Sequence, residues 1–188
     1  MKFGVLQFFS WPERRVDLAA VYARALQRIE IMDQSGYDAV WLAEHHFSSF
    51  SVCPSVHMMG MLAAARTTRL RIGTGVSLAP FYHPLRLAEE VALLDVLSGG
   101  RVNWGAGRGF ARVEFENFGV PPQESTSRFH ETVEIVLRAW TQEKLSFTGT
   151  HFHFEDVEVL PKPMQRPHPP VWMAATSGAC GSRMATRS

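Results

Sequence analysis

Apolar positions along this chain follow two patterns: short uninterrupted runs, and longer stretches in which they recur at helical spacing. The first pattern predicts buried strands, and the second predicts amphipathic helices with one face on a core. The predicted strands are residues 2–9, 37–43, 70–78, a strand that begins at 101, and 171–175. The predicted helices are residues 17–35, 54–65, 84–98 and one that begins near Ser127. The repeating unit is therefore a strand, a loop and a helix.

The clearest pattern lies between Arg69 and Phe110. Its first strand leads through His83-Pro84 into a helix, and proline suits the first turn of a helix. Gly99-Gly100 ends that helix, and a second strand from Arg101 runs into a glycine-rich segment that we expect to be a flexible loop. Strands joined through one helix lie parallel with a right-handed crossover, so the loops that follow them open on the same face. Functional residues are expected on that face.

The pattern changes after Phe110. Ser127 is a candidate N-cap of the helix that follows. Residues 145–154, with Gly149-Thr150 at their centre, predict a small β-hairpin. The proline-rich residues 160–170 predict an extended connector that leads into the last strand.

Five parallel strands with helices between them fit either an open doubly wound sheet or a (β/α)8 barrel. The first strand is followed by no glycine fingerprint, which disfavours a dinucleotide-binding sheet. A complete barrel typically needs about 250 residues. In the barrel interpretation, this chain of 188 residues holds only part of the repeat, about five of eight units by that estimate.

Composition narrows the class of protein. The chain is 46% hydrophobic and 20% charged, which is ordinary for one soluble domain with a core. The net charge of +1 gives no electrostatic reason to expect nucleic acid or an anionic membrane as partner. No stretch approaches the ~20 apolar residues of a membrane span. Cys53 and Cys180 lie far apart, so we expect free thiols and a cytoplasmic protein.

Glu44-His45-His46 follows the second predicted strand. A carboxylate and two imidazoles could bind a metal, but adjacent residues on an extended segment point to opposite sides, and no third ligand is obvious. A single imidazole that donates or accepts a proton is the interpretation that we favour over a metal site. A structural, hydrogen-bonded histidine is the alternative that this motif leaves open.

Other polar candidates also follow predicted strands. Arg108 in its glycine-rich segment could bind a phosphate, and Arg128 near a helix start is a similar candidate. Thr176 and Ser177 come after the last strand, where hydroxyls and helix N–H groups suit an anion. Each has a simpler alternative. The glycine-rich segment of Arg108 could be only a tight turn, Arg128 could be a solvated arginine, and Thr176 and Ser177 could be a plain N-cap.

Gly73 and Gly75 interrupt the third predicted strand, just before Val76. Glycines weaken a strand unless a ligand or another backbone comes close. A planar ring stacked on this bend would explain them, and so would a β-bulge. The tryptophans and phenylalanines near the strand ends could line a pocket, although most buried aromatic residues belong to a core.

Three segments, YDAVWLAEHHF, LRIGTGVSLAPFYHPLRLAEEVALLDVLSGGRVNWGAGRG and PHPPVWMAATS, together resemble the bacterial luciferase-like flavin monooxygenases. The resemblance covers residues 1–177. It implies a (β/α)8 barrel that binds reduced FMN, or in some branches the deazaflavin F420, for which this sequence is less suited. In the family, reduced FMN and O2 form a C4a-hydroperoxyflavin that oxidises a small organic substrate such as an aldehyde. The resemblance also implies a separate flavin reductase and a homo- or heterodimer.

The resemblance also assigns roles to residues. His45 matches the family's catalytic histidine. Gly75-Val76 matches its non-proline cis peptide beneath the flavin ring, and Gly107 matches the position that faces the reactive side of the ring. Bacterial luciferase itself has a cysteine there, so the glycine argues against a light emitter.

Four further residues match the phosphate end of the family's flavin site. Arg108 and Arg128 match arginines near the FMN phosphate, and Thr176 and Ser177 match the phosphate-binding end of the fifth strand. After them the residues ACGSRMATRS depart from the family pattern. We therefore expect residues 1–188 to be a single barrel domain that is incomplete at its C-terminus. A fragment or frame-shifted product is the explanation that we favour, over a short relative that dimerises or a binding protein without turnover.

Overall fold

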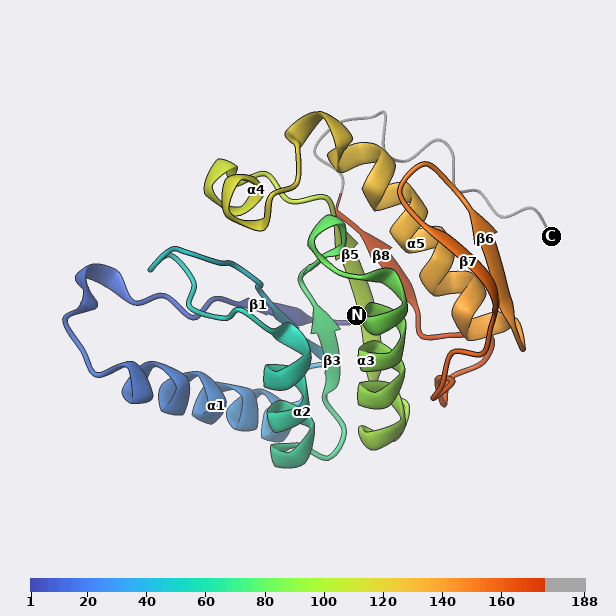
Figure 1. Ribbon diagram of the computed structural model, residues 1–188. Helices are drawn as coiled ribbons and strands as arrows, with labels where there is room; N and C mark the ends of the chain where they lie inside the picture. Colours follow the sequence, from blue (N-terminus) through green and yellow to red (C-terminus); the bar gives the residue numbers. More distant parts are fainter. Residues whose placement is uncertain (175–188) are drawn as a thin grey trace.

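The computed structural model describes residues 1–174. At its centre is a parallel sheet whose strands lie side by side in the order β1 (Gly4–Gln7), β2 (Ala39–Leu42), β3 (Arg71–Thr74), β5 (Val102–Gly107) and β8 (Val171–Met173) (Figure 1). A short strand, β4 (Ser77–Leu78), pairs with the C-terminal end of β5. Apart from β4, neighbours in the sheet follow one another along the chain. This is the order of a barrel, whereas a doubly wound sheet has its first strand in the middle. The expected (β/α)8-type architecture is confirmed.

Four long helices connect the strands and pack against one another in chain order. They are α1 (Leu18–Gln34), α2 (Val56–Arg66), α3 (Pro84–Leu97) and α5 (Ser125–Thr141). Asp17 caps α1 and Ser55 caps α2, because each side chain accepts a hydrogen bond from a backbone N–H of the first turn. Pro84 is the first residue of α3, as predicted. The first three helices match the predicted ranges closely.

The core lies between the sheet and these helices. Val40, Ile72 and Trp104, on three neighbouring strands, have no exposed surface. The buried side of α5 carries the apolar residues that its spacing predicts, which include Phe129, Val133, Val136 and Trp140. The Trp140 Nε1 donates a hydrogen bond to the Ala88 carbonyl at 2.9 Å, which ties α5 to α3.

Two strand predictions are corrected. The predicted strand 70–78 is broken after Thr74, where a cis peptide joins Gly75-Val76, and the chain then continues as β4. The glycine-rich loop begins later than predicted, because residues 105–107 belong to β5. A Cβ on Gly105 would lie 2.0 Å from the Thr74 carbonyl oxygen, and the Thr74 hydroxyl hydrogen-bonds to the Gly105 backbone. Glycine is needed here because two backbones touch.

The segment after β5 also differs from the prediction. Helix α4 (Arg112–Phe118), which was not predicted from the sequence, follows β5. Of its residues, only Glu114 and Phe115 are buried. Helix α5 begins before the predicted cap, after a 3-10 turn at Pro122–Glu124. Ser127 therefore lies within the first turn, where its hydroxyl donates to the Glu124 carbonyl. The prediction of Ser127 as N-cap is wrong.

The hairpin and the connector predicted in the second half are confirmed. The last strand is not buried as predicted, because within residues 1–174 β8 pairs only with β5, and Trp172 is 55% exposed. Strands β6 (Leu145–Thr148) and β7 (His153–Val157) form the predicted antiparallel hairpin beside α5. An irregular connector then leads to β8. Two further 3-10 turns lie at Pro12–Arg14 and Ala79–Phe81. Within residues 1–174, no helix combines the length and the apolar character that a membrane crossing requires.

Candidate active site

The segments that follow β1, β2, β3 and β5 surround one cavity of about 510 Å³. This volume lies in the usual range of small-molecule and cofactor pockets. The shared face predicted from the strand–helix–strand pattern is therefore present, and it is hollow. The lining residues include Leu6, Phe8, Glu44, His45, Phe50, Gly75, Val76, Gly107, Arg108, Phe110, Thr126, Phe129 and His130.

Most of the candidates named from the sequence meet at this cavity. His45, Gly75, Val76, Gly107 and Arg108 all line it. Thr176 and Ser177 lie outside the described residues. Arg128 is not among the lining residues, and its guanidinium is bound by Glu124, with Nη2 at 2.8 Å from Oε2. Its proposed contact with a phosphate stays a prediction.

One wall of the cavity is formed mainly by backbone and small side chains. The Gly75-Val76 bend lies directly against the end of β5, where a Cβ on Gly107 would approach Val76 Cγ2 to 2.3 Å. The Gly75 N–H donates to the Leu42 carbonyl at 2.7 Å, so the bend is also anchored to β2. The result is an apolar wall of backbone and small groups. Such a wall suits the face of a planar ring.

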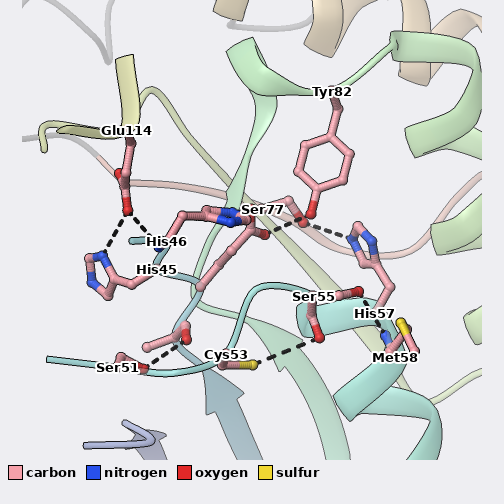
Figure 2. Close-up of polar contacts among 12 residues, drawn as sticks. His45, His46, Ser51, Cys53, Ser55, His57, Met58, Ser77, Tyr82 and Glu114 are labelled. Atoms are coloured by element: carbon pink, nitrogen blue, oxygen red, sulfur yellow. Dashed lines mark hydrogen bonds and ion pairs between the residues drawn. The ribbon is translucent and has the colours of Figure 1, made fainter. Parts of the chain in front are cut away.

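His45 is held by a carboxylate that the sequence did not reveal. Its Nδ1 lies 3.2 Å from Oε1 of Glu114, and the same oxygen accepts the His46 backbone N–H at 3.1 Å (Figure 2). The Glu114 side chain is only 1% exposed. Because a carboxylate accepts hydrogen bonds, the ring proton sits on Nδ1 and Nε2 has a free lone pair in the neutral imidazole. Residues 1–174 give Nε2 no hydrogen-bond partner.

His46 has a different carboxylate partner. Its Nε2 lies 3.1 Å from Oε1 of Glu44, and the Tyr82 hydroxyl donates to the other oxygen of Glu44 at 2.9 Å. Burial, and then the nearby Glu44 carboxylate, raise the pKa of Tyr82 far above its ordinary value, so the phenol keeps its proton. His46 does not line the cavity of about 510 Å³. The two adjacent histidines thus serve separate sites, as their alternation along the chain predicts.

The metal interpretation has no support from the geometry of the described part of the chain. Residues 1–174 contain no cluster of three or more histidine, cysteine, aspartate or glutamate side chains placed to hold a metal ion. The nearby Cys53 is a free, buried thiol. Burial, and then the Glu44 carboxylate, raise the pKa of this thiol to about 12, so it stays protonated.

Arg108 is the cation at this cavity that is available to an anion. Its Nη1 lies 3.3 Å from the Ser125 hydroxyl, and within residues 1–174 it makes no ion pair. Thr126 and His130 of α5 line the same cavity. The Ser125 hydroxyl donates its own proton to the Pro122 carbonyl, so the donor offered to an anion is the Arg108 guanidinium, a group that binds phosphate well. The residues present therefore fit a ligand with a planar ring and an anionic end.

A second network of hydrogen-bonded polar groups lies beside the Gly75-Val76 bend. The Nε2 of His57 lies 3.0 Å from the Ser77 hydroxyl (Figure 2). The Nδ1 of His57 lies 3.0 Å from Oε2 of Glu90. Arg86 binds the other oxygen of Glu90 at 2.7 Å. Ser77 has no exposed surface. The serine, histidine and carboxylate resemble a nucleophilic triad, but the serine is closed off from solvent.

The sequence did not single out Glu114, Tyr82 or Ser125. Glu114 lies in a short helix with no clear apolar pattern, and nothing local distinguishes it from Glu116, which is exposed and pairs with Arg112. Its role follows only from long-range packing of α4 on the Glu44-His45-His46 segment. No local signal in the sequence would have found it, because Glu114 and Glu116 both lie beside Phe115.

Known proteins are similar to this chain in sequence. A model of the luciferase-like monooxygenase family matches residues 1–188. The chain is 42% identical over 157 residues to the uncharacterised protein y4wF of Sinorhizobium fredii, which covers 84% of this chain and 46% of that protein. It is 33% identical over 158 residues to the oxygenase component of the flavin-dependent trigonelline monooxygenase of Acinetobacter baylyi, over 82% of this chain and 43% of that protein.

A solved structure supports the same conclusion. The crystal structure of the monooxygenase RslO1 from Streptomyces bottropensis matches 96% of this chain and 55% of its own, with 37% sequence identity and a TM-score of 0.91. The chain thus spans about half the length of the relatives that it matches. From the family match over the whole sequence and from the shared fold, the chain belongs to the luciferase-like monooxygenase family.

Proposed function

We propose that the cavity around His45 binds reduced FMN and that the protein acts as an FMN-dependent monooxygenase on a small organic substrate, such as an aldehyde. The observation that carries the proposal is the meeting, in one cavity, of the His45 imidazole and the apolar wall at Gly75-Val76. A relative that is 33% identical is named as the oxygenase component of a flavin-dependent monooxygenase, which supports the same chemistry.

In this proposal different residues bind different parts of FMN. The wall at Gly75, Val76 and Gly107 supports the flavin ring, and the Arg108 guanidinium binds the phosphate. Arg128, Thr176 and Ser177 remain proposed phosphate contacts. Bound reduced flavin would supply two electrons to O2, so that one oxygen atom enters the substrate and the other leaves as water.

His45 is the proposed proton carrier. Glu114 holds the ring through Nδ1 and leaves Nε2 directed to accept a proton or, after protonation, to donate one. The aromatic residues around His45 keep bulk water from this position when a ligand fills the cavity. The Gly75-Val76 wall and His45 together place a proton-transfer group beside a planar ring.

Reduced FMN requires a supplier, so we propose a separate flavin reductase as partner. The printed description of the Acinetobacter relative as an oxygenase component supports a two-component system. A homo- or heterodimer is also part of the proposal, by resemblance to the family.

The test is anaerobic loading of the folded 188-residue protein with reduced FMN, followed by O2 and 2-naphthaldehyde. We expect 2-naphthoic acid in amounts that rise with protein concentration, and the His45→Ala variant should form it at least ~100-fold more slowly because a positioned acid–base group is lost. Folded protein that binds FMN but oxidises no member of an aldehyde, alkane and ketone panel would overturn the proposed activity.

The second candidate is a flavin-binding protein without turnover. It is supported by the apolar wall at Gly75-Val76 and by Arg108, which would bind a flavin whether or not turnover follows. It predicts FMN binding with no product in the experiment above. A parallel titration with F420 tests the remaining alternative, an F420-dependent oxidoreductase, and tighter binding of F420 than of FMN would favour it.

A further inference from the structure

Three phenylalanine rings surround the His45 imidazole at the cavity. Phe8 stacks on it with ring centroids 6.3 Å apart, and Phe50 and Phe110 meet it edge-on at 5.3 and 5.9 Å. Phe8 and Phe50 also contact each other at 5.2 Å. We call Phe8, Phe50 and Phe110 the aromatic lobe of the cavity.

The aromatic lobe is not part of the buried core, because two of its rings are exposed to solvent. Phe50 is 57% exposed and Phe110 is 78% exposed, although both line the cavity. Buried phenylalanines of this protein, such as Phe9 and Phe129, are at most 1% exposed. Ring surface beside a cavity is apolar area that a ligand can cover, and covering it is favourable.

Charge is distributed unevenly around the cavity. Arg108, Thr126 and His130 line it from the end of β5 and from α5. Two rings of the aromatic lobe come from the segments after β1 and β2, and the third, Phe110, lies two residues after Arg108 in the segment that follows β5. The Glu44 carboxylate also lies at the cavity, but the Tyr82 hydroxyl and His46 occupy its oxygens. The three side chains of the lobe are uncharged rings, and all three line the cavity.

We propose that the aromatic lobe is the substrate subsite and that it selects neutral, planar ring compounds over linear chains and over anions. This inference rests on the proposed function, which assigns the Gly75-Val76 wall and Arg108 to the flavin. Rings prefer edge-to-face and offset-stacked neighbours at 4.5–7 Å. A substrate ring that covers Phe50 and Phe110 would lie against the His45 imidazole, where the proposed proton transfer takes place.

The test measures binding by calorimetry with three ten-carbon probes: 2-naphthol, 1-decanol and 2-naphthalenesulfonate. The protein is the full 188-residue chain, loaded with FMN. We expect 2-naphthol to bind at least ~10-fold more tightly than either other probe, since an aromatic pair contributes about 0.5–1.5 kcal/mol beyond its buried area and several pairs form. Phe50→Leu and Phe110→Leu should each weaken 2-naphthol binding ~3- to 10-fold.

Phe47→Leu is the matched control, because Phe47 is also 57% exposed but does not line this cavity. It should leave the 2-naphthol affinity unchanged, and all three variants should bind FMN as the unmodified protein does. Equal affinity for 2-naphthol and 1-decanol, or equal effects of Phe47→Leu and Phe50→Leu, would overturn the subsite while FMN binding remained. Tighter binding of the sulfonate would overturn the selectivity. Loss of FMN binding in the unmodified protein would overturn the proposed function, and the subsite with it.

Discussion

His45 and His57 are both bonded to a glutamate, yet their surroundings differ in one decisive way. His57 uses both ring nitrogens, one on Glu90 and one on the buried Ser77 hydroxyl. His45 uses only Nδ1, and within residues 1–174 its Nε2 has no partner. His45 lines the cavity, whereas His57 does not.

The difference separates a structural histidine from one available for chemistry. A ring with both nitrogens bonded to protein contributes to stability and has no free position for a substrate proton. A ring held through one nitrogen by a buried carboxylate is oriented and still has a basic position at its other end. The sequence alone does not show which ring nitrogens are bonded, because the partners Glu114, Glu90 and Ser77 lie 20 or more positions away from the histidines.

The largest expected effect concerns catalysis at His45. His45→Ala should slow product formation by at least ~100-fold, because proton transfer by a positioned side chain typically contributes 10²–10⁴-fold. FMN affinity should change little, since the wall and Arg108 are intact. Steady-state kinetics and flavin titration of both proteins measure the two effects. Turnover within threefold of the unmodified protein would remove His45 from the mechanism.

The second effect concerns stability at His57. His57→Leu leaves the Ser77 hydroxyl and the Glu90 carboxylate without their shared partner. A buried polar group left unpaired costs about 1–3 kcal/mol, so we expect the free energy of unfolding in urea to fall by about 3 kcal/mol. His153→Leu, in the exposed hairpin strand β7, is the control and should stay within about 0.5 kcal/mol. Equal effects at both positions would contradict the structural role.

The third effect concerns Glu114 as a positioning residue. Glu114→Gln keeps an acceptor for the His46 N–H but weakens the contact that orients the His45 ring. We expect kcat to fall about 10-fold, while KM and FMN affinity stay the same. The effect is smaller than the 10²–10⁴-fold that a general acid or base contributes, because the His45 imidazole itself is still present. Glu116→Gln on the same helix is the control, because Glu116 is exposed and pairs only with Arg112. A change in KM or in stability without a change in kcat would assign Glu114 to packing.

The smallest expected effect is the pH dependence of the stability that comes from the hydrogen bonds joining Ser77, His57 and Glu90. The hydrogen bond from His57, and after it the one from Arg86, lower the pKa of Glu90 from 4.5 to about 2. A carboxyl whose pKa is lowered on folding stabilises the protein above its unfolded value and loses that contribution as pH falls. The difference in melting temperature between the unmodified protein and Glu90→Gln should therefore shrink between pH 4.5 and pH 2. A difference that is constant over this range would contradict the assignment.

Periodicity and glycine placement revealed the framework of the site. The strand–helix–strand pattern between Arg69 and Phe110 predicted a common face, and His45 follows the strand that also ends on that face. The glycines at 73 and 75 indicated an irregular strand, which the structure resolves as β3, a bend and β4. These features are local, so a single sequence carries them.

The rest depends on contacts between distant segments. Gly105 reads as part of a flexible loop, but its backbone packs on Thr74, 31 positions away. Glu114 meets His45 across 69 positions, through a helix too short to leave a periodic signal. The aromatic lobe likewise joins Phe8, Phe50 and Phe110 from three segments. Only the packed fold brings such residues together.

The central claim is that the cavity beside His45 binds a flavin, and an anaerobic titration of the 188-residue protein with reduced FMN tests it most directly. The account predicts saturable one-to-one binding that Arg108→Gln weakens at least ~10-fold, as loss of a charge-assisted contact to phosphate requires. Arg112→Gln, which changes an exposed arginine outside the cavity, should have no effect. Absence of binding by folded protein, or equal binding by both variants, would contradict the claim.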